Sequence, residues 1–106
     1  MEVLINKLNQ LALDFNLISK AIDGAKSWVS SEDFDIENTI TAKFQYEFHV
    51  HKLCFKHEYK DLPYIETILN ITLDEDDIGY YCWHTTLDGE TIDDVLVITD
   101  HELKYS

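Results

Sequence analysis

Arginine is absent from this chain, so all eight basic residues are lysines, against 21 aspartates and glutamates and a net charge of −13. Because recognition of nucleic-acid phosphates needs clustered Lys and Arg, this composition argues against direct nucleic-acid binding. It argues against binding to an anionic membrane for the same reason. The lack of arginine also removes the usual bidentate anchor for carboxylate and phosphate substrates. A basic protein is the natural partner of such a charge.

Glycine and proline are scarce as well, with three residues and one residue respectively. This scarcity argues against a loop-rich scaffold and against an all-β sandwich with many tight turns. Two cysteines, Cys54 and Cys82, are too few for a disulfide framework. No run approaches the roughly eighteen apolar residues of a membrane span, and the first residues, MEVLINKLNQ, do not resemble a signal peptide. We therefore expect a cytoplasmic protein with reduced thiols.

The chain has 106 residues, of which 45% are hydrophobic and 12% aromatic. This composition argues against disorder, and the length is typical of one domain. A domain of this size buries roughly two thirds of its unfolded surface, so it needs no metal or disulfide to form a core. We expect a single folded domain over residues 1–106.

Residues 3–22 predict an amphipathic helix, because their apolar side chains recur three or four positions apart. Asp23-Gly24 is typical of a helix end, since glycine readily adopts the left-handed backbone conformation. The stretch AKSWVSS, residues 25–31, fits either a second short helix or a turn. The apolar face of the predicted helix consists of Leu4, Leu8, Leu11, Phe15, Ile18 and Ile22, widened by Leu13 and Leu17.

Four stretches predict β-strands, at residues 39–51, 64–73, 78–86 and 91–99. The first alternates between apolar and polar residues, so one sheet face is expected to be solvated, which favours an antiparallel sheet. The apolar positions change parity after His51, which predicts a bulge near Lys52. The apolar side of the first strand consists of Ile40, Ala42, Phe44, Tyr46, Phe48 and Val50.

Asp88-Gly89, between the last two strands, predicts a β-hairpin with a two-residue type I′ turn. That turn places His84 opposite Asp93 and Trp83 opposite Asp94. The predicted fold class is α+β, with the N-terminal amphipathic helix packed on one face of a four-stranded antiparallel sheet that ends in this hairpin.

The stretch EFHVHKLCFKHEYK, residues 47–60, holds three histidines and one cysteine. His49 and His51 lie two positions apart on one face of the predicted strand, a spacing that can place two imidazoles on one metal ion. Cys54 and His57 lie beyond the change of parity, and the spacing H-x-H-x₂-C-x₂-H matches no closed zinc pattern. We interpret these residues as solvated strand surface and predict no metal site and no cofactor.

Cys82 and His84 point the same way on one strand with Asp93 opposite, an arrangement conceivable for a nucleophile, a base and an orienting group. However, the sequence has no nucleophile elbow, glycine-rich loop, HExxH or paired-cysteine motif. The His84–Asp93 pair is more simply a cross-strand contact.

The acidic stretch 74–77 lacks the alternating ligands, central glycine and closing glutamate of an EF-hand loop. We predict neither catalytic residues nor a calcium site, and no enzymatic activity.

Acidic residues cluster at 32–37, 74–77 and 88–94, and the last two clusters flank the final hairpin, where they can meet in space. Tyr and Trp beside carboxylates are typical of protein–protein interfaces. These features favour a protein-binding inhibitor, most concretely a bacterial immunity protein that occludes the active site of a cognate basic, nuclease-type toxin. Two alternatives are an acidic secretion-type chaperone or adaptor and a nucleic-acid mimic that inhibits a DNA-binding enzyme. The predicted partner-binding residues are Asp74, Glu75, Asp76, Asp77, Tyr80, Trp83, Asp88, Glu90, Asp93 and Asp94.

Overall fold

A computed structural model of the chain describes residues 2–57 and 61–104. Two N-terminal helices precede a four-stranded antiparallel sheet, which confirms the predicted α+β class. The strands lie in the order β1-β2-β3-β4, each hydrogen-bonded to the next along the chain. The elements are α1 (Glu2–Asp14), α2 (Leu17–Val29), α3 (Asn38–Thr41), β1 (Gln45–Cys54), β2 (Tyr64–Leu73), β3 (Asp76–Thr86), β4 (Thr91–Ile98) and α4 (His101–Lys104).

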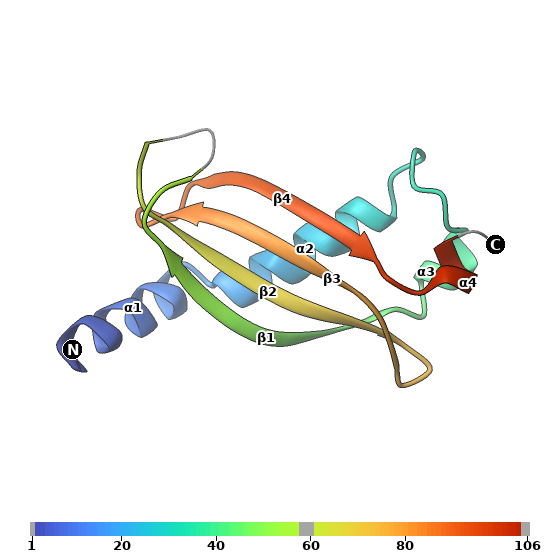
Figure 1. Cartoon of the computed structure of the whole chain (residues 1–106), viewed down its shortest axis with the longest axis horizontal. Helices are drawn as coiled ribbons and strands as arrows, with labels where there is room; N and C mark the ends of the chain where they lie inside the picture. Colours follow the sequence, from blue (N-terminus) through green and yellow to red (C-terminus); the bar gives the residue numbers. More distant parts are fainter. Residues whose placement is uncertain (1, 58–60, 105–106) are drawn as a thin grey trace.

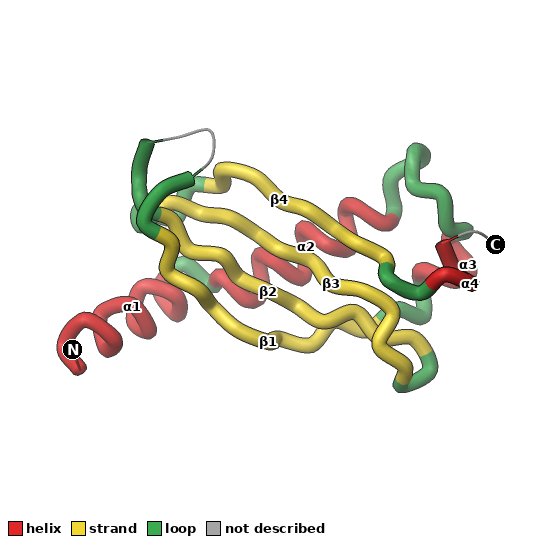
Figure 2. Tube along the Cα trace, viewed as in Figure 1, coloured by secondary structure: helices red, strands yellow, loops and turns green. Residues whose placement is uncertain are grey.

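Helix α2 runs along one face of the sheet, whereas α1 extends past the sheet's end (Figures 1 and 2). The buried residues of α2 recur every four positions and so share one side of the helix. Two of them are alanines, which allow the helix backbone to lie close to the strands. The core between the helix and the sheet includes Leu17, Ala21, Ala25 and Val29 of α2, Leu69 and Ile71 of β2, and Tyr81 of β3.

The predicted single helix is in fact two helices. Asn16 has φ 51° and ψ 47°, a left-handed conformation that interrupts the helix after Asp14. Asparagine is one of the few residues that tolerate this conformation. The predicted apolar face is therefore wrong in part, since Leu4 in α1 is 50% exposed, whereas Leu17, predicted to widen that face, is completely buried. No residue of α1 is buried, and the helix that packs on the sheet is the second one.

The predicted helix end at Asp23-Gly24 is also wrong, because α2 continues through these residues to Val29. A β-carbon at Gly24 would lie 2.5 Å from Cζ3 of Trp83 and closer still to the hydroxyl of Tyr81. Glycine is thus required here for the close approach of the helix to β3 and not for helix termination.

Strand β1 begins later than predicted, at Gln45, because residues 38–41 form the short helix α3. Its bulge lies between Phe48 and Val50 and not near Lys52. The extra residue at His49 changes which side chains face α2.

Beyond this bulge, His51 pairs with the buried Thr67, so it lies on the α2 side of the sheet. Val50 pairs with Ile68 and faces away from α2. Both placements are the reverse of the predicted ones. Strand β2 has the predicted bounds. Its alternation predicts five inward residues, of which Ile65, Thr67, Leu69 and Ile71 are buried and Leu73 is half-buried.

The β3–β4 connection is a three-residue loop and not the predicted two-residue type I′ turn. The Gly89 N–H donates to Thr86 O at 3.1 Å, the Thr86 N–H donates to Glu90 O at 2.8 Å, and Gly89 has φ 86°. A register shift between His84 and Thr85 compensates for the longer loop. Two predicted cross-strand pairs are therefore confirmed, His84–Asp93 and Trp83–Asp94.

The predicted charged turn lies between β2 and β3. Asp74 and Glu75 have φ values of 51° and 71°, so both central residues are left-handed, as a type I′ turn requires. Asp76 and Asp77 already belong to β3. Four consecutive carboxylates, two in the turn and two at the start of β3, therefore lie at one end of the sheet.

Candidate functional site

The predicted partner-binding residues do not form one surface. Asp74–Asp77 lie at the β2–β3 turn, whereas Asp88 and Glu90 lie at the β3–β4 loop, at the opposite end of β3 (Figure 1). An 11-residue strand spans about 35 Å, and the longest dimension of the molecule is 46 Å. The hypothesis that these two clusters meet is therefore wrong.

Asp93 and Asp94 point to opposite faces of β4, as consecutive strand residues must. Asp94 Oδ2 accepts a hydrogen bond of 2.6 Å from the Tyr81 hydroxyl on the α2 side. Burial, together with this bond, raises the pKa of Tyr81 well above its usual range, so the hydroxyl stays protonated and donates. Asp94 therefore stabilises the fold, while Asp93 is exposed on the other face, opposite His84.

Tyr80 and Trp83 also lie on opposite faces of the sheet. Tyr80 is 39% exposed on the face away from α2. Trp83 is half-buried on the α2 side, with its ring centroid 6.4 Å from that of Tyr81. Of the two predicted aromatic anchors, Tyr80 is thus the one available to a partner.

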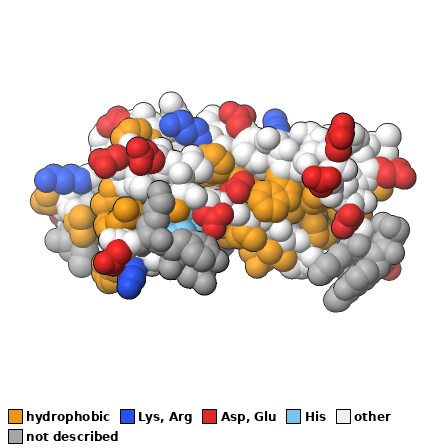
Figure 3. Space-filling view, turned by 90° about the horizontal axis from the view of Figure 1, so that it is seen from above, with side chains coloured by type: hydrophobic (Ala, Val, Ile, Leu, Met, Phe, Trp, Pro, Cys, Tyr) orange, Lys and Arg blue, Asp and Glu red, His pale blue; other side chains and the backbone are white. Residues whose placement is uncertain are grey.

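Three acidic segments lie toward the end of the molecule where α3 and α4 lie, with the first and second of them on opposite sides of that end (Figure 1). They are the connection from α2 to α3, the β2–β3 turn, and the residues that follow β4. Asp74, Asp76, Asp100 and Glu102 line one shallow hollow there. Figure 3 shows acidic side chains at the same end, beside an apolar area, and further acidic side chains along the rest of that face. We define the acidic end as Glu32, Asp33, Asp35, Glu37, Asp74, Glu75, Asp76, Asp77, Asp100 and Glu102.

The carboxylates of the acidic end have no ion pair with the lysines whose side chains the structure describes. Among residues 2–57, 61–100, 102 and 103, none of them lies within 4.0 Å of a lysine nitrogen. Lys43 lies between α3 and β1, near this end, and it too forms no such pair. Nine of the ten residues are exposed and Asp100 is half-buried. Exposed carboxylates on the same end of a molecule create a negative potential that extends roughly one screening length, about 8 Å, into physiological solution.

A second group of polar side chains occupies the sheet face that α2 does not cover. His57 follows β1, is 3% exposed, and has its ring centroid 5.5 Å from that of His84. His84 Nε2 lies 2.7 Å from Glu66 Oε2. One nitrogen each of His57 and His84 and one carboxylate oxygen of Asp93 lie within 4.8 Å of one another. We call these four residues, His57, Glu66, His84 and Asp93, the histidine cluster.

The histidine pair singled out from the sequence does not assemble. His49 occupies the bulge of β1 and is exposed. His51 lies on the α2 side, where its Nδ1 is 2.9 Å from Thr67 Oγ1. Burial lowers the pKa of His51. The bulge therefore separates two imidazoles that a regular strand would place on one face.

Cys82 lies on the same sheet face as His84, two residues away, and is buried. Burial, reinforced by the negative charge of Glu66 and opposed by Lys52, raises the pKa of the Cys82 thiol to about 11. The thiol is therefore protonated at neutral pH, which disfavours nucleophilic chemistry and metal binding at its sulfur.

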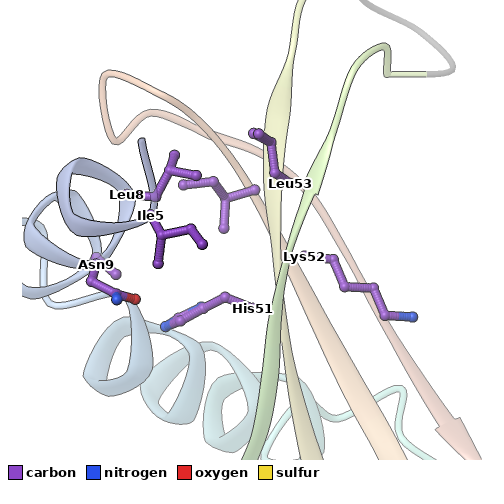
Figure 4. A pocket seen from close by; sticks show the side chains of 8 residues that line it. Ile5, Leu8, Asn9, His51, Lys52 and Leu53 are labelled. Atoms are coloured by element: carbon purple, nitrogen blue, oxygen red, sulfur yellow. The ribbon is translucent and has the colours of Figure 1, made fainter. Parts of the chain in front are cut away.

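An apolar groove lies between α1 and the end of β1, with a volume of about 140 Å³. Ile5 and Leu8 of α1 face Leu53 across it, while His51 points toward the groove and Lys52 points away (Figure 4). Several further apolar residues of α1 are exposed, Val3 at 68% and Leu13 at 69%.

Sequence reasoning missed His57 and Glu66 as members of a cluster. The alternation of β2 places Glu66 outward, and the register of β2 and β3 sets it opposite His84. A prediction of the β2–β3 register would thus have placed Glu66 beside His84. No periodic signal places His57, because it lies in the connection after β1, outside any strand.

No protein-family model matches the chain, and neither a curated protein nor a solved structure shows significant similarity to it. Within the described part of the chain, none of the helices combines the length and the apolar content needed to cross a bilayer.

Proposed function

We propose that this protein is an inhibitor that binds one basic protein through its acidic end. The most concrete form is a bacterial immunity protein that occludes the active site of a cognate nuclease-type toxin. The observation that supports this proposal is the presence of ten carboxylates toward one end of the molecule, none paired with a lysine whose side chain the structure describes. A nuclease groove is basic because it must bind phosphates, so it is complementary to such a surface.

The proposed mechanism requires only attraction and occlusion. Unpaired carboxylates at the acidic end would attract the basic groove over a distance and raise the association rate, an effect that salt weakens. Tyr80 is exposed on β3, three residues after Asp77, and would supply an aromatic contact beside the charges. Asp88 and Glu90 lie at the far end of β3, so they would add to the general attraction and not to the direct contact.

An inhibition assay with matched variants tests this proposal. The acidic-end variant replaces Asp74, Glu75, Asp76 and Asp77 by the corresponding amides, which remove four charges and preserve side-chain shape. The control variant removes four charges elsewhere, at Asp14, Asp23, Asp88 and Glu90. The basic partner is first isolated by affinity capture from a lysate of the host cell. Its nuclease activity is then assayed in the presence of each protein at a 1:1 ratio.

The wild-type protein and the control variant should inhibit, while the acidic-end variant should bind at least tenfold more weakly. Such a loss is expected when paired charges are removed from an interface. Equal inhibition by all three proteins would show that the acidic end is not the contact surface.

A chaperone or adaptor is the second candidate, and the groove between α1 and β1 favours it. The exposed Ile5 and the half-buried Leu8 would bind an apolar segment of a client, or of a second copy of the chain. This alternative predicts a stable homodimer in sedimentation analysis and a loss of client binding in Ile5→Asp. The acidic-end variant would then bind clients as the wild type does.

A further inference from the structure

The histidine cluster has the composition of a transition-metal site. Two imidazoles and one carboxylate are a common set of protein ligands for Zn²⁺, which accepts nitrogen and oxygen donors in tetrahedral geometry. In that geometry, ligand atoms lie about 3.3–3.6 Å from one another. The atoms of His57, His84 and Asp93 lie within 4.8 Å of one another without an ion. Because Asp93 is exposed, its carboxylate can rotate to shorten these separations.

The hydrogen bonds of His84 show which of its nitrogens is available. Nε2 bonds to Glu66, whereas Nδ1 is buried and has no hydrogen-bond partner. If Nδ1 carried a proton, it would be a buried donor without an acceptor, which is unfavourable. The favoured tautomer therefore places the proton on Nε2, facing Glu66, and leaves the Nδ1 lone pair without a partner. Carboxylate–histidine–metal arrangements hold imidazole ligands in this way.

We propose that the histidine cluster binds one divalent transition metal ion, Zn²⁺ being the best match, through His57, His84 and Asp93. Glu66 is the positioning residue that orients the His84 ring. Three protein ligands leave the fourth coordination position for water or for a group from another molecule. The site would join the connection after β1 to β3 and β4. It does not depend on the proposed inhibitor function, because its strand residues lie toward the end of the sheet opposite the acidic end.

Titration of the metal-free full-length protein with Zn²⁺ tests this proposal. After treatment with a chelator and its removal, calorimetry should show saturable binding of one ion per chain. At a free Zn²⁺ concentration 100-fold above the Kd, the Tm should rise by on the order of 10 °C, because the ion binds only the folded state. Absence of saturable 1:1 binding would overturn the proposal.

Substitutions then identify the ligands. Asp93→Asn should weaken Zn²⁺ binding at least tenfold without unfolding the chain, because residue 93 is exposed and the amide oxygen can still accept the Asp94 N–H. His57→Gln should do the same, with circular dichroism to verify folding. Glu66→Gln should weaken binding by about 10–100-fold, as expected for a residue that orients a ligand.

His49→Gln is the matched control, since it removes an exposed histidine outside the cluster. It should leave the affinity unchanged, and so should Cys82→Ser. The proposal is wrong if Asp93→Asn binds Zn²⁺ as the wild type does, or if His49→Gln abolishes binding, because the ion would then be held elsewhere.

Discussion

At the residue scale, two adjacent aspartates of β4 have different roles because their side chains lie on opposite faces of the sheet. Asp94 accepts a hydrogen bond from buried Tyr81, whereas the adjacent Asp93 is exposed beside two histidines. Cross-strand register, which the sequence predicts correctly here, locates both carboxylates. It does not reveal that one stabilises the core and the other faces a polar cluster, because that depends on which face α2 covers.

The Tyr81–Asp94 hydrogen bond gives a first prediction. Tyr81→Phe should lower the free energy of unfolding by about 1–3 kcal/mol, because it leaves a half-buried carboxylate without its donor. Tyr80→Phe is the matched control on the exposed face, and it should change stability by less than about 0.5 kcal/mol. Urea denaturation of both variants measures the difference, and equal stabilities would contradict this account of Asp94.

The pH dependence of stability gives a second prediction. Burial lowers the pKa of His51 in the folded chain below 6.5, its ordinary value. Between these two pKa values the unfolded state binds more protons, so this contribution to stability is complete above about pH 6.5 and is lost as the pH falls. The free energy of unfolding of the wild type should therefore decrease between pH 7.5 and pH 5.5.

His51→Gln should show a smaller decrease over the same interval in urea denaturation, because glutamine does not titrate. His49→Gln, at the exposed bulge position, should retain the wild-type decrease. An unchanged decrease in His51→Gln would mean that another group causes it.

At the element scale, strands were predicted better than helices, for a physical reason. Alternation of apolar and polar residues located β2 fully, and it located most of β3 and β4, because each strand has two faces with different environments. Helix boundaries depended on Asn16 and Gly24, whose roles are set by tertiary contacts. The β1 bulge was predicted at the wrong residue for a similar reason. The sequence shows that the apolar positions change from even to odd numbers along the strand, but it does not show at which residue the bulge lies.

The packing of α2 gives a third prediction. Gly24→Ala should destabilise the protein by about 1–3 kcal/mol, although alanine normally stabilises a helix, because the added methyl group meets Tyr81 and Trp83. Ser27→Ala, at an exposed position of the same helix, should be neutral or slightly stabilising. Thermal unfolding of both variants makes the comparison, and a more stable Gly24→Ala would show that α2 packs less closely than described.

At the scale of the whole molecule, charge is distributed unevenly along an elongated body. The overall negative charge follows from composition alone, but which acidic segments lie toward the same end does not. Sequence clusters suggested that residues 74–77 and 88–94 meet, whereas the fold brings Asp74 and Asp76 to one hollow with Asp100 and Glu102 and places residues 32–37 toward the same end of the molecule. Residues 74–77 and 88–90 lie apart because β3 runs the length of the sheet between them. The β2–β3 turn that precedes this strand and the β3–β4 loop that follows it therefore lie at opposite ends of the molecule.

Affinity capture from a lysate of the host cell is the measurement that most directly tests whether the acidic end binds one basic partner. Wild-type protein, the acidic-end variant and the control variant serve as baits at low and at moderate salt. The account predicts that wild type and control retain one basic protein in stoichiometric amount at moderate salt, and that the acidic-end variant does not. A broad set of basic proteins that washes away with salt, or equal retention by the acidic-end variant, would contradict it.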